Sequence, residues 1–267
     1  DEEFRLRSDT WLPAIEETCA VAGIPAEGIR PYADGSNLVA RVGEAWVVKI
    51  FPPFHRDQWE SERWALPRIH AASPLPTPEL VAEGERADGY TYVVMTHLPG
   101  RSMEHCWGSF SLEERAGLMR SIGELMRAVH ANPVGKVASE LPGFDQMLRS
   151  RVDGLRARHE GLGTPEWLVD RLEDSVPEAL IALDLGTPPV LLTGEYTPFN
   201  LLVTDARTPV RLAAMLDFGD CMVGPAVYDL LGPIAFLGEG RAELVQPLFE
   251  GHGLLTWPPS PDVRRGL

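Results

Sequence analysis

Three residues with oxygen-bearing side chains lie close together in the second half of the sequence, around two short apolar runs. Glu195 and Asn200 precede the run Leu201–Val203, and Asp217 directly follows the run Leu212–Leu216. The polar segment between the runs is rich in turn formers, which predicts a β-hairpin. Amide and carboxylate oxygens suit Mg²⁺, which usually keeps phosphates and waters as its other ligands, and a further carboxylate could orient a hydroxyl nucleophile. The pattern therefore indicates chemistry on phosphate groups.

The spacing of these residues is similar to that in kinases, where an acid, an asparagine after four intervening residues and the Asp of D-F-G act together. The segment also resembles the motif of the aminoglycoside phosphotransferase family, usually H-G-D-x-x-x-x-N followed by a strand that ends in Asp and Phe or Trp. Gly194, Asn200 and Asp217–Gly219 fit this motif, whereas Thr193 stands where His is usual and Glu195 where Asp is usual. Hygromycin phosphotransferases look most similar, because the whole chain can be laid alongside them.

Composition limits the class of protein. The chain has 267 residues, of which 44% are hydrophobic, enough for one large or two modest domains. It contains no apolar stretch of about 18 residues, so no membrane span is expected. Cys19, Cys106 and Cys221 are odd in number and far apart, which argues against a disulfide framework or a zinc site and indicates a reducing cytoplasm.

The net charge of the chain limits which classes of partner are expected. A formal net charge of -15 argues against a nucleic-acid partner, which would need a basic face. It suits a small cationic molecule, although an acidic surface that simply maintains solubility explains the charge equally well. Lysine occurs only at positions 49 and 136. Because the chain avoids lysine but places Lys49 in V-V-K-I, we expect a role for an ammonium group there.

The first part of the chain is expected to form a helix over residues 1–27 and three strands within residues 29–51. The turn between the first two strands, Asp34–Asn37, is short and polar, and as a plain hairpin turn it would look the same. The resemblance implies that Gly35, Ser36 and Asn37 of this turn cover the phosphates of a nucleotide. It also implies that Lys49 contacts the α- and β-phosphates.

Residues 56–71 favour a helix that Pro67 should end or kink. An acid on this helix could pair with Lys49 and fix its rotamer. Glu62 is the candidate, and Glu60 remains a competing one.

Two further strands are expected, at Glu79–Ala82 and Tyr90–Met95. The second runs into the sequence T-H-L-P-G, which the resemblance identifies as a hinge between two lobes. Adenine would then bond to backbone groups in the hinge, which consists of Met95, Thr96, His97 and Leu98.

The remainder of the chain has helical patterns. Ser111–Glu114 is a capping box, and Thr164–Glu166 is a helix start with proline at the first position. We expect helices near residues 111–130 and 145–159, from residue 166 with a kink or split at Pro177, and over Glu239–His252 with an interruption at Pro247. His130 is expected to be structural, and Asp229 resembles a family residue that ties the catalytic loop.

Together these observations predict an α+β, protein-kinase-like fold. Residues 1–98 would form a small nucleotide-binding lobe with a mostly antiparallel sheet, and residues 99–267 a mainly helical catalytic and substrate-binding lobe. The resemblance implies a monomer that transfers the γ-phosphoryl group of ATP or GTP to a hydroxyl of a cationic, hygromycin-like aminoglycoside. Asn200 and Asp217 would hold Mg²⁺, and Glu195 would orient or deprotonate the hydroxyl group. A nucleotide-binding pseudoenzyme and a kinase of another small metabolite remain alternatives.

Overall fold

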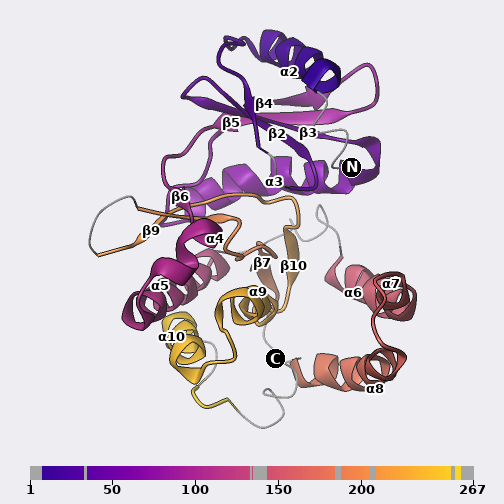
Figure 1. Cartoon of the computed structure of the whole chain (residues 1–267), viewed down its shortest axis with the longest axis vertical. Helices are drawn as coiled ribbons and strands as arrows, with labels where there is room; N and C mark the ends of the chain where they lie inside the picture. Colours follow the sequence, from indigo (N-terminus) through magenta and orange to yellow (C-terminus); the bar gives the residue numbers. More distant parts are fainter. Residues whose placement is uncertain are drawn as a thin grey trace.

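The chain folds into two lobes, one above the other in Figure 1. The computed structural model describes residues 8–32, 35–132, 134, 143–183, 188–204, 209–253 and 256–259. In these residues, the first lobe contains a five-stranded antiparallel sheet with two helices, and the second is mainly helical with two small sheets. The expected α+β two-lobe architecture is confirmed.

The small lobe is built on a sheet whose neighbouring strands all run antiparallel, in the order β1-β2-β3-β5-β4. Its elements are α2 (Ser8–Ala22), β1 (Arg30–Pro31), β2 (Leu38–Val42), β3 (Trp46–Phe51), the 3-10 turn η1 (Pro53–His55), α3 (Arg56–Ala72), β4 (Leu80–Glu85) and β5 (Thr91–Thr96). The expected three strands and the two that follow them are therefore present.

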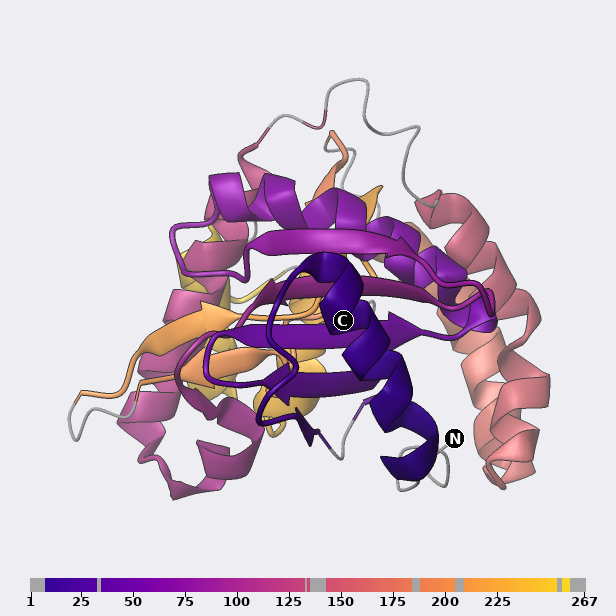
Figure 2. The same ribbon diagram turned by 90° about the horizontal axis from the view of Figure 1, so that it is seen from above.

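The two helices cover opposite faces of this sheet, and α2 crosses the strands in the view from above (Figure 2). Successive side chains of a strand point to opposite faces. Val48 and Ile50 of β3 pack in one core with Trp11 and Ile15 of α2. Lys49 lies between them in sequence and therefore points to the other face, where α3 lies.

In the large lobe, helices α5 and α10 pack closely against each other. The elements of this lobe are β6 (Arg101–Ser102), α4 (Met103–Cys106), the 3-10 turn η2 (Trp107–Ser109), α5 (Leu112–His130), α6 (Phe144–Asp153), α7 (Leu155–Gly161), α8 (Glu166–Leu183), β7 (Val190–Leu192), β8 (Leu201–Val203), β9 (Leu212–Met215), β10 (Met222–Gly224), α9 (Tyr228–Leu237) and α10 (Ala242–His252). The expected capping box begins α5: Ser111 Oγ accepts from the amide of Glu114 at 3.2 Å. Where α5 and α10 cross, Gly123 and Gly251 allow close contact, since a Cβ at either would collide with the facing backbone.

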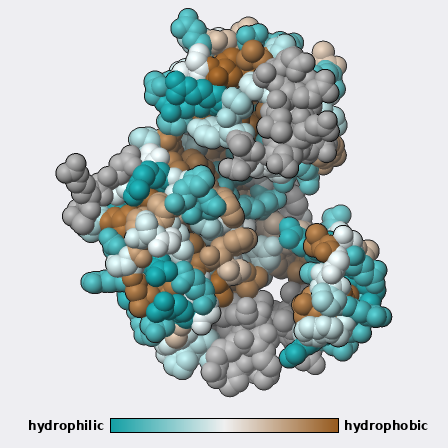
Figure 3. All heavy atoms as spheres, viewed as in Figure 1, coloured by the Kyte–Doolittle hydropathy of each residue, from teal (hydrophilic) through white to brown (hydrophobic). Residues whose placement is uncertain are grey.

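Helices α6, α7 and α8 form an arm at the side of this lobe. The space-filling view shows a hollow between the arm and the body that carries α5, α9 and α10 (Figure 3). The arm is anchored through its first helix: the ring of Phe144 meets Tyr228 of α9 edge-on, with centroids 5.1 Å apart. Gly143 also forms a bridge to Val223 of β10.

Three prolines lie inside helices where the sequence predicts an end, a kink or a split. None of these helices ends there: α3 runs through Pro67, α8 through Pro177 and α10 through Pro247. A proline removes one helical hydrogen bond, but Leu66 and Ile69 are buried on either side of Pro67. Packing against the core therefore holds both halves of α3 in one helix.

Other boundaries differ from the expectation for local reasons. The first helix ends at Ala22 because Gly23 takes a positive φ of 69° and terminates it. The helix expected over 145–159 is divided into α6 and α7 at Gly154. Helices α4 and α9 were not predicted. Asp34 and residues 205–208 of the two expected turns lie outside the described residues.

Candidate active site

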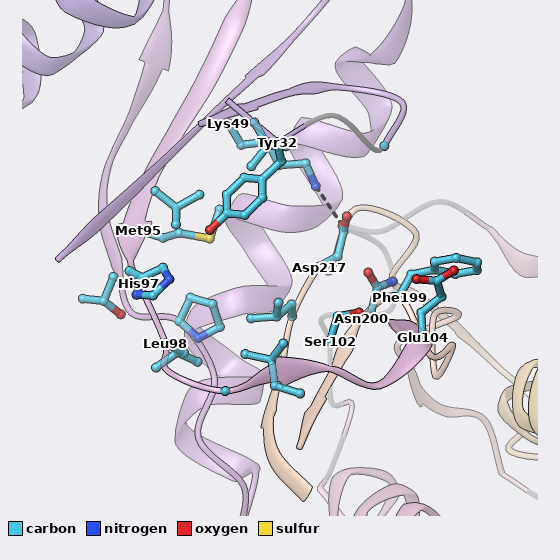
Figure 4. Close-up of a pocket in the computed structure, with 18 of the residues that line it drawn as sticks. Tyr32, Lys49, Met95, His97, Leu98, Ser102, Glu104, Phe199, Asn200 and Asp217 are labelled. Atoms are coloured by element: carbon cyan, nitrogen blue, oxygen red, sulfur yellow. Dashed lines mark hydrogen bonds and ion pairs between the residues drawn. The ribbon is translucent and has the colours of Figure 1, made fainter. Parts of the chain in front are cut away.

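The base of the β8–β9 hairpin brings the two candidate metal ligands together. The strands pair antiparallel, and the amide of Leu216 donates to the carbonyl of Asn200 at 2.8 Å. Asp217 follows directly, so its side chain and that of Asn200 face the same cavity (Figure 4). Asp217 has a positive φ of 61°, and its Oδ1 accepts from the amide of Gly219 at 3.1 Å. Aspartate tolerates this conformation because its side chain can bond the backbone two residues later.

Lys49 connects the two lobes at this point. Its Nζ lies 2.7 Å from Glu62 Oε2 on α3 and 2.8 Å from Asp217 Oδ1, the contact dashed in Figure 4. Glu60 pairs with Arg56 instead. Of the two acids that the sequence offered as partners of Lys49, the structure therefore selects Glu62. Burial opposes the charge of Lys49, but the two carboxylates outweigh this effect and raise its pKa. The ammonium in turn holds the pKa of Asp217 below its ordinary value, although burial acts the other way.

Glu195 lies beside Asn200 and Asp220 at the edge of the same site. Nδ2 of Asn200 donates to Glu195 Oε2 at 2.8 Å, which leaves the amide oxygen of Asn200 to face another partner. Burial, and then the neighbouring Asp220 carboxyl group, raise the pKa of Glu195 to about 8. Glu195 therefore shares a site with other acids, and a cation placed there would favour its ionised form.

The loop before the hairpin is held by Asp229, a buried residue of α9. Its Oδ1 accepts from the amide of Gly194 at 2.9 Å, and its Oδ2 accepts from the amide of Thr193 at 3.2 Å. His130 Nε2 lies 2.8 Å from the same Oδ2, and His252 Nε2 lies 3.0 Å from His130 Nδ1. Asp229 thus ties the loop as the resemblance implies. His130 of α5 contacts the carboxylate of Asp229, and His252 of α10 contacts His130 in turn.

Gly194 allows this loop to pass close to the segment that follows Asp217. Its φ is 70°, and an added Cβ would lie 2.9 Å from the carbonyl oxygen of Asp220. Glycine adopts such a conformation at little cost, and it alone has no Cβ. The close approach is what places Glu195 next to Asp220.

The turn that is expected to cover the phosphates is fixed by its asparagine. Asn37 is 5% exposed; its Nδ2 donates to Gln58 Oε1 at 2.9 Å, and its Oδ1 lies 2.9 Å from His55 Nδ1. The side chain of Asn37 is thus occupied in anchoring the turn to η1 and α3. Gly35 and Ser36 line the neighbouring cavity.

The connection between the lobes forms one wall of a cavity that we call the hinge cavity. The amide of Thr96 donates to the carbonyl of Glu79 at 3.0 Å, and that of His97 donates to the carbonyl of Ala45 at 2.7 Å. These bonds hold the connection against the sheet. The cavity beside it is lined by all four residues of the expected hinge, together with Lys49, Glu62 and Asp217; the four are Met95, Thr96, His97 and Leu98.

The two cavities adjoin one another. The hinge cavity has a volume of about 420 Å³ and the one at Glu195 about 410 Å³, and both touch Phe199, Asn200 and Asp217. These volumes suit small molecules. The described lining of the cavity at Glu195 contains four carboxylates and no lysine or arginine, which favours a cationic occupant. The four carboxylates are Glu104, Glu195, Asp217 and Asp220.

The chemistry of Asn200 and Asp217 fits a magnesium ion. Magnesium takes one or two protein carboxylates and fills its other positions with phosphate oxygens and water. The Asp217 side chain is 39% exposed. Within the described ranges, no group of three or more His, Cys, Asp or Glu residues is arranged as a metal site. Two oxygen-bearing side chains would leave the other positions of such an ion to phosphate oxygens and water.

Comparison with known families agrees with this geometry. Residues 28–267 match the model of the family described as "Phosphotransferase enzyme family". The chain belongs to this phosphotransferase family. Lys49, Asn200 and Asp217 all lie within the matched residues.

Solved structures share the fold of this phosphotransferase at low sequence identity. The GDP complex of wild-type aminoglycoside 2'-phosphotransferase-IIIa has a TM-score of 0.77 and 20% identity, covering 97% of this chain and 87% of that chain. The streptomycin-ATP-APH(2")-IIa ternary complex has a TM-score of 0.69 and 17% identity, covering 95% of this chain and 87% of that chain. The macrolide 2'-phosphotransferase MphH from Brachybacterium faecium has a TM-score of 0.60 and 20% identity, covering 95% of this chain and 86% of that chain.

No curated protein matches the sequence of this phosphotransferase. Among the helices in the described ranges, none is both long enough and apolar enough to cross a membrane.

The residues singled out from the sequence gather around the two cavities of the phosphotransferase, with Asn37 as an anchor of the turn. Glu104, Phe199 and Asp220 are among the described lining residues that the sequence analysis did not single out. Asp220 directly follows D-F-G, so the sequence contained a signal for it. Glu104 and Phe199 carried none, because nothing in their local pattern separates them from surface residues.

Proposed function

We propose that this phosphotransferase transfers the γ-phosphoryl group of ATP or GTP to a hydroxyl group of an aminoglycoside or related cationic antibiotic, with a hygromycin-like molecule as the first candidate. The observation that carries the proposal is the carboxylate-lined cavity at Glu195, directly beside the Lys49–Asp217 pair. In support, solved neighbours contain GDP, ATP or ADP, and several of the solved neighbours contain kanamycin, streptomycin or gentamicin.

In this proposal residues 1–98 bind the nucleotide, and residues 99–267 supply the catalytic groups and the acceptor site. The base would occupy the hinge cavity. Because the amides of Thr96 and His97 already donate to carbonyls, the amide of Leu98 is the hinge donor best placed for the base; it donates to no carbonyl in the part of the chain described. Backbone groups of Gly35 and Ser36 would approach the phosphates, and Lys49 would neutralise them.

The transfer needs positioning and neutralisation of charge more than covalent catalysis. The acceptor oxygen forms a bond to the γ-phosphorus while the bond from that phosphorus to the β–γ bridging oxygen breaks, and the nucleoside diphosphate leaves with the electron pair. Glu195 takes the proton of the hydroxyl group. Asn200 and Asp217 would hold Mg²⁺, which stabilises negative charge on the phosphates when it is bound.

The proposal is tested by incubating the protein with Mg²⁺ and either ATP or GTP against a panel of acceptors. The panel contains hygromycin B, kanamycin, gentamicin, streptomycin, a macrolide and a neutral sugar. Release of nucleoside diphosphate and addition of one phosphate to the acceptor, detected by mass spectrometry, are expected for a cationic member. Turnover of the neutral sugar alone would favour a kinase of another small metabolite.

A nucleotide-binding pseudoenzyme is the second candidate. It is favoured by Thr193 and Glu195, which depart from the family motif, and by the raised pKa of Glu195. A pseudoenzyme would still gain thermal stability from nucleotide, since any ligand specific to the folded state raises its stability. A higher Tm with ATP or GTP, but no product from any acceptor, would identify it. Absence of any Tm change with millimolar nucleotides would contradict both candidates.

A further inference from the structure

We propose that Phe199 forms the aromatic platform of the acceptor site, on which an apolar ring face of the acceptor stacks while Glu104 and Asp220 receive its ammonium groups. This inference rests on the proposed function and deepens it, because it names the residues that select the acceptor. None of the three was singled out by its sequence pattern.

The first observation is the exposure of Phe199 at the centre of the site. The residue lies in the loop between Glu195 and Asn200, lines both cavities, and is 53% exposed. Figure 4 shows its side chain near Asn200, with Glu104 close by. A large aromatic side chain left half-exposed beside catalytic groups is informative, because exposed apolar surface rimmed by polar residues marks ligand sites.

The second observation is the support of the ring from one side. Phe236 of α9, itself 54% exposed, meets Phe199 edge-to-face, with centroids 5.8 Å apart and planes at 83°. This geometry is a favourable one for an aromatic pair. It restrains the orientation of the Phe199 ring but covers little of it, so a large part of the ring remains available to a ligand.

The third observation is that the backbone around Phe199 is fixed. The carbonyl of Pro198 accepts from the amide of Glu104 at 3.0 Å, and the amide of Asn200 donates to Thr197 at 3.2 Å. Phe199 is thus held between two hydrogen-bonded neighbours, and Glu104 is tied to the same loop. A preorganised group binds a ligand with less loss of conformational freedom.

The surroundings of the ring decide the chemistry of the ligand. The cavity at Glu195, which the ring lines, also contains the carboxylates of Glu104, Glu195 and Asp220. Its described lining includes His105, 3.1 Å from Glu104, but no lysine or arginine. Ammonium groups are attracted both by carboxylates and by aromatic faces. The combination selects an amino sugar or aminocyclitol, which has an apolar ring face and ammonium groups at its edge. An anionic metabolite would be repelled.

The experiment compares Phe199→Ala, Phe199→Tyr and Phe54→Ala. Phe54 is a matched control, because it is 71% exposed and lies among the described lining residues of neither cavity. Each variant is assayed on the cationic acceptor with the highest turnover for the wild type.

We expect Phe199→Ala to raise the acceptor KM about tenfold with a nearly unchanged kcat, as loss of uniform binding does. The KM for the nucleotide and the nucleotide-induced rise in Tm should stay within about twofold of wild type. Phe199→Tyr should restore the acceptor KM, and Phe54→Ala should not change it.

Two failures are distinguishable. If the wild type turns over a cationic acceptor and Phe199→Ala leaves its KM unchanged, the platform is overturned while the proposed function stands. If Phe199→Ala raises the nucleotide KM instead, the ring belongs to the nucleotide site and the platform is overturned as well. If the wild type modifies no acceptor, the proposed function fails and the inference fails with it.

Discussion

Lys49 of the small lobe and Asp217 of the large lobe lie 2.8 Å apart, so that one ion pair crosses between the two lobes at the active site. On its other side the Lys49 ammonium lies 2.7 Å from Glu62, which belongs to the small lobe. The lysine is 4% exposed, whereas the Asp217 side chain is 39% exposed. The pair therefore positions both groups while leaving the aspartate accessible to a metal ion and phosphates.

Replacing Asp217 should abolish phosphoryl transfer without unfolding the protein. Asp217→Asn keeps the shape and tolerates the positive φ of 61°, but loses the charge; we expect turnover to fall at least about a hundredfold. Asp217→Ala, which also removes the oxygen ligand, should be inactive too. Product formation and circular dichroism measure the two effects. Near wild-type turnover in either variant would contradict the assignment of Asp217 as a metal ligand.

Glu62 and Glu60 provide a matched pair of variants on one helix. Glu62→Gln leaves the buried Lys49 with a single carboxylate, so we expect the nucleotide KM to rise about tenfold and the free energy of unfolding to fall by about 2 kcal/mol. Glu60→Gln removes an exposed contact with Arg56 at 3.6 Å and should change neither. Steady-state kinetics and urea denaturation measure both quantities. Equal effects of the two substitutions would contradict the specific role of Glu62.

Glu195 can be tested by changing its charge and its length separately. Glu195→Gln should abolish most turnover but keep nucleotide binding, because the amide preserves shape and cannot take a proton. Glu195→Asp should also lose activity, by about a hundredfold, if the site is built around the longer side chain. The structure supports that view, since Asn200 donates to Glu195 Oε2 at 2.8 Å. Unchanged turnover in Glu195→Gln would exclude the base role.

Asp229 should affect catalysis through the loop that it holds. In Asp229→Asn one oxygen becomes an amide nitrogen that cannot accept from the backbone, so the bonds to Thr193 and Gly194 cannot both remain. Misplacement of the loop by about 1 Å would lower kcat by about a hundredfold, with little change in the nucleotide KM. Asp170→Asn, at an exposed ion pair with Arg156, is the control. A higher nucleotide KM with unchanged kcat would contradict this positioning role.

His252 should make stability depend on pH. Burial, and then repulsion from His130, lower the pKa of His252 to about 4, whereas an unfolded histidine titrates near 6.5. Between pH 4 and 6.5 the unfolded chain binds more protons at this histidine than the folded chain does, so acid favours unfolding. The stability that comes from keeping His252 neutral is therefore complete above about pH 6.5 and is lost as the pH falls toward 4. It amounts to about 3 kcal/mol.

The test is urea denaturation of wild type and His252→Gln at pH 7.5 and 5. The wild type should lose more of its free energy of unfolding on acidification than the variant does. His105→Gln, at a 73% exposed position, should behave as the wild type. Equal losses in wild type and His252→Gln would contradict the assignment.

The sequence by itself determined the local framework of the site. The hairpin strands, the capping box at Ser111 and the strand that carries Lys49 depend on patterns within a few residues, and the structure contains all of them. Patterning of this kind reports which face of an element is apolar, because side chains repeat with the period of the backbone. It also placed Asn200 directly before β8 and Asp217 just after β9, with Glu195 in the loop between β7 and β8.

Only the tertiary structure decided which side chains meet. Lys49 and Asp217 are 168 positions apart, and His130 and Asp229 are 99 apart, so no local pattern could pair them. The choice of Glu62 over Glu60 depended on which face of α3 meets the sheet. The platform of Phe199 and Phe236 depended on how α9 packs beside the hairpin loop. Periodicity specifies how an element presents its faces, whereas the contacts between distant elements arise from packing of the whole core.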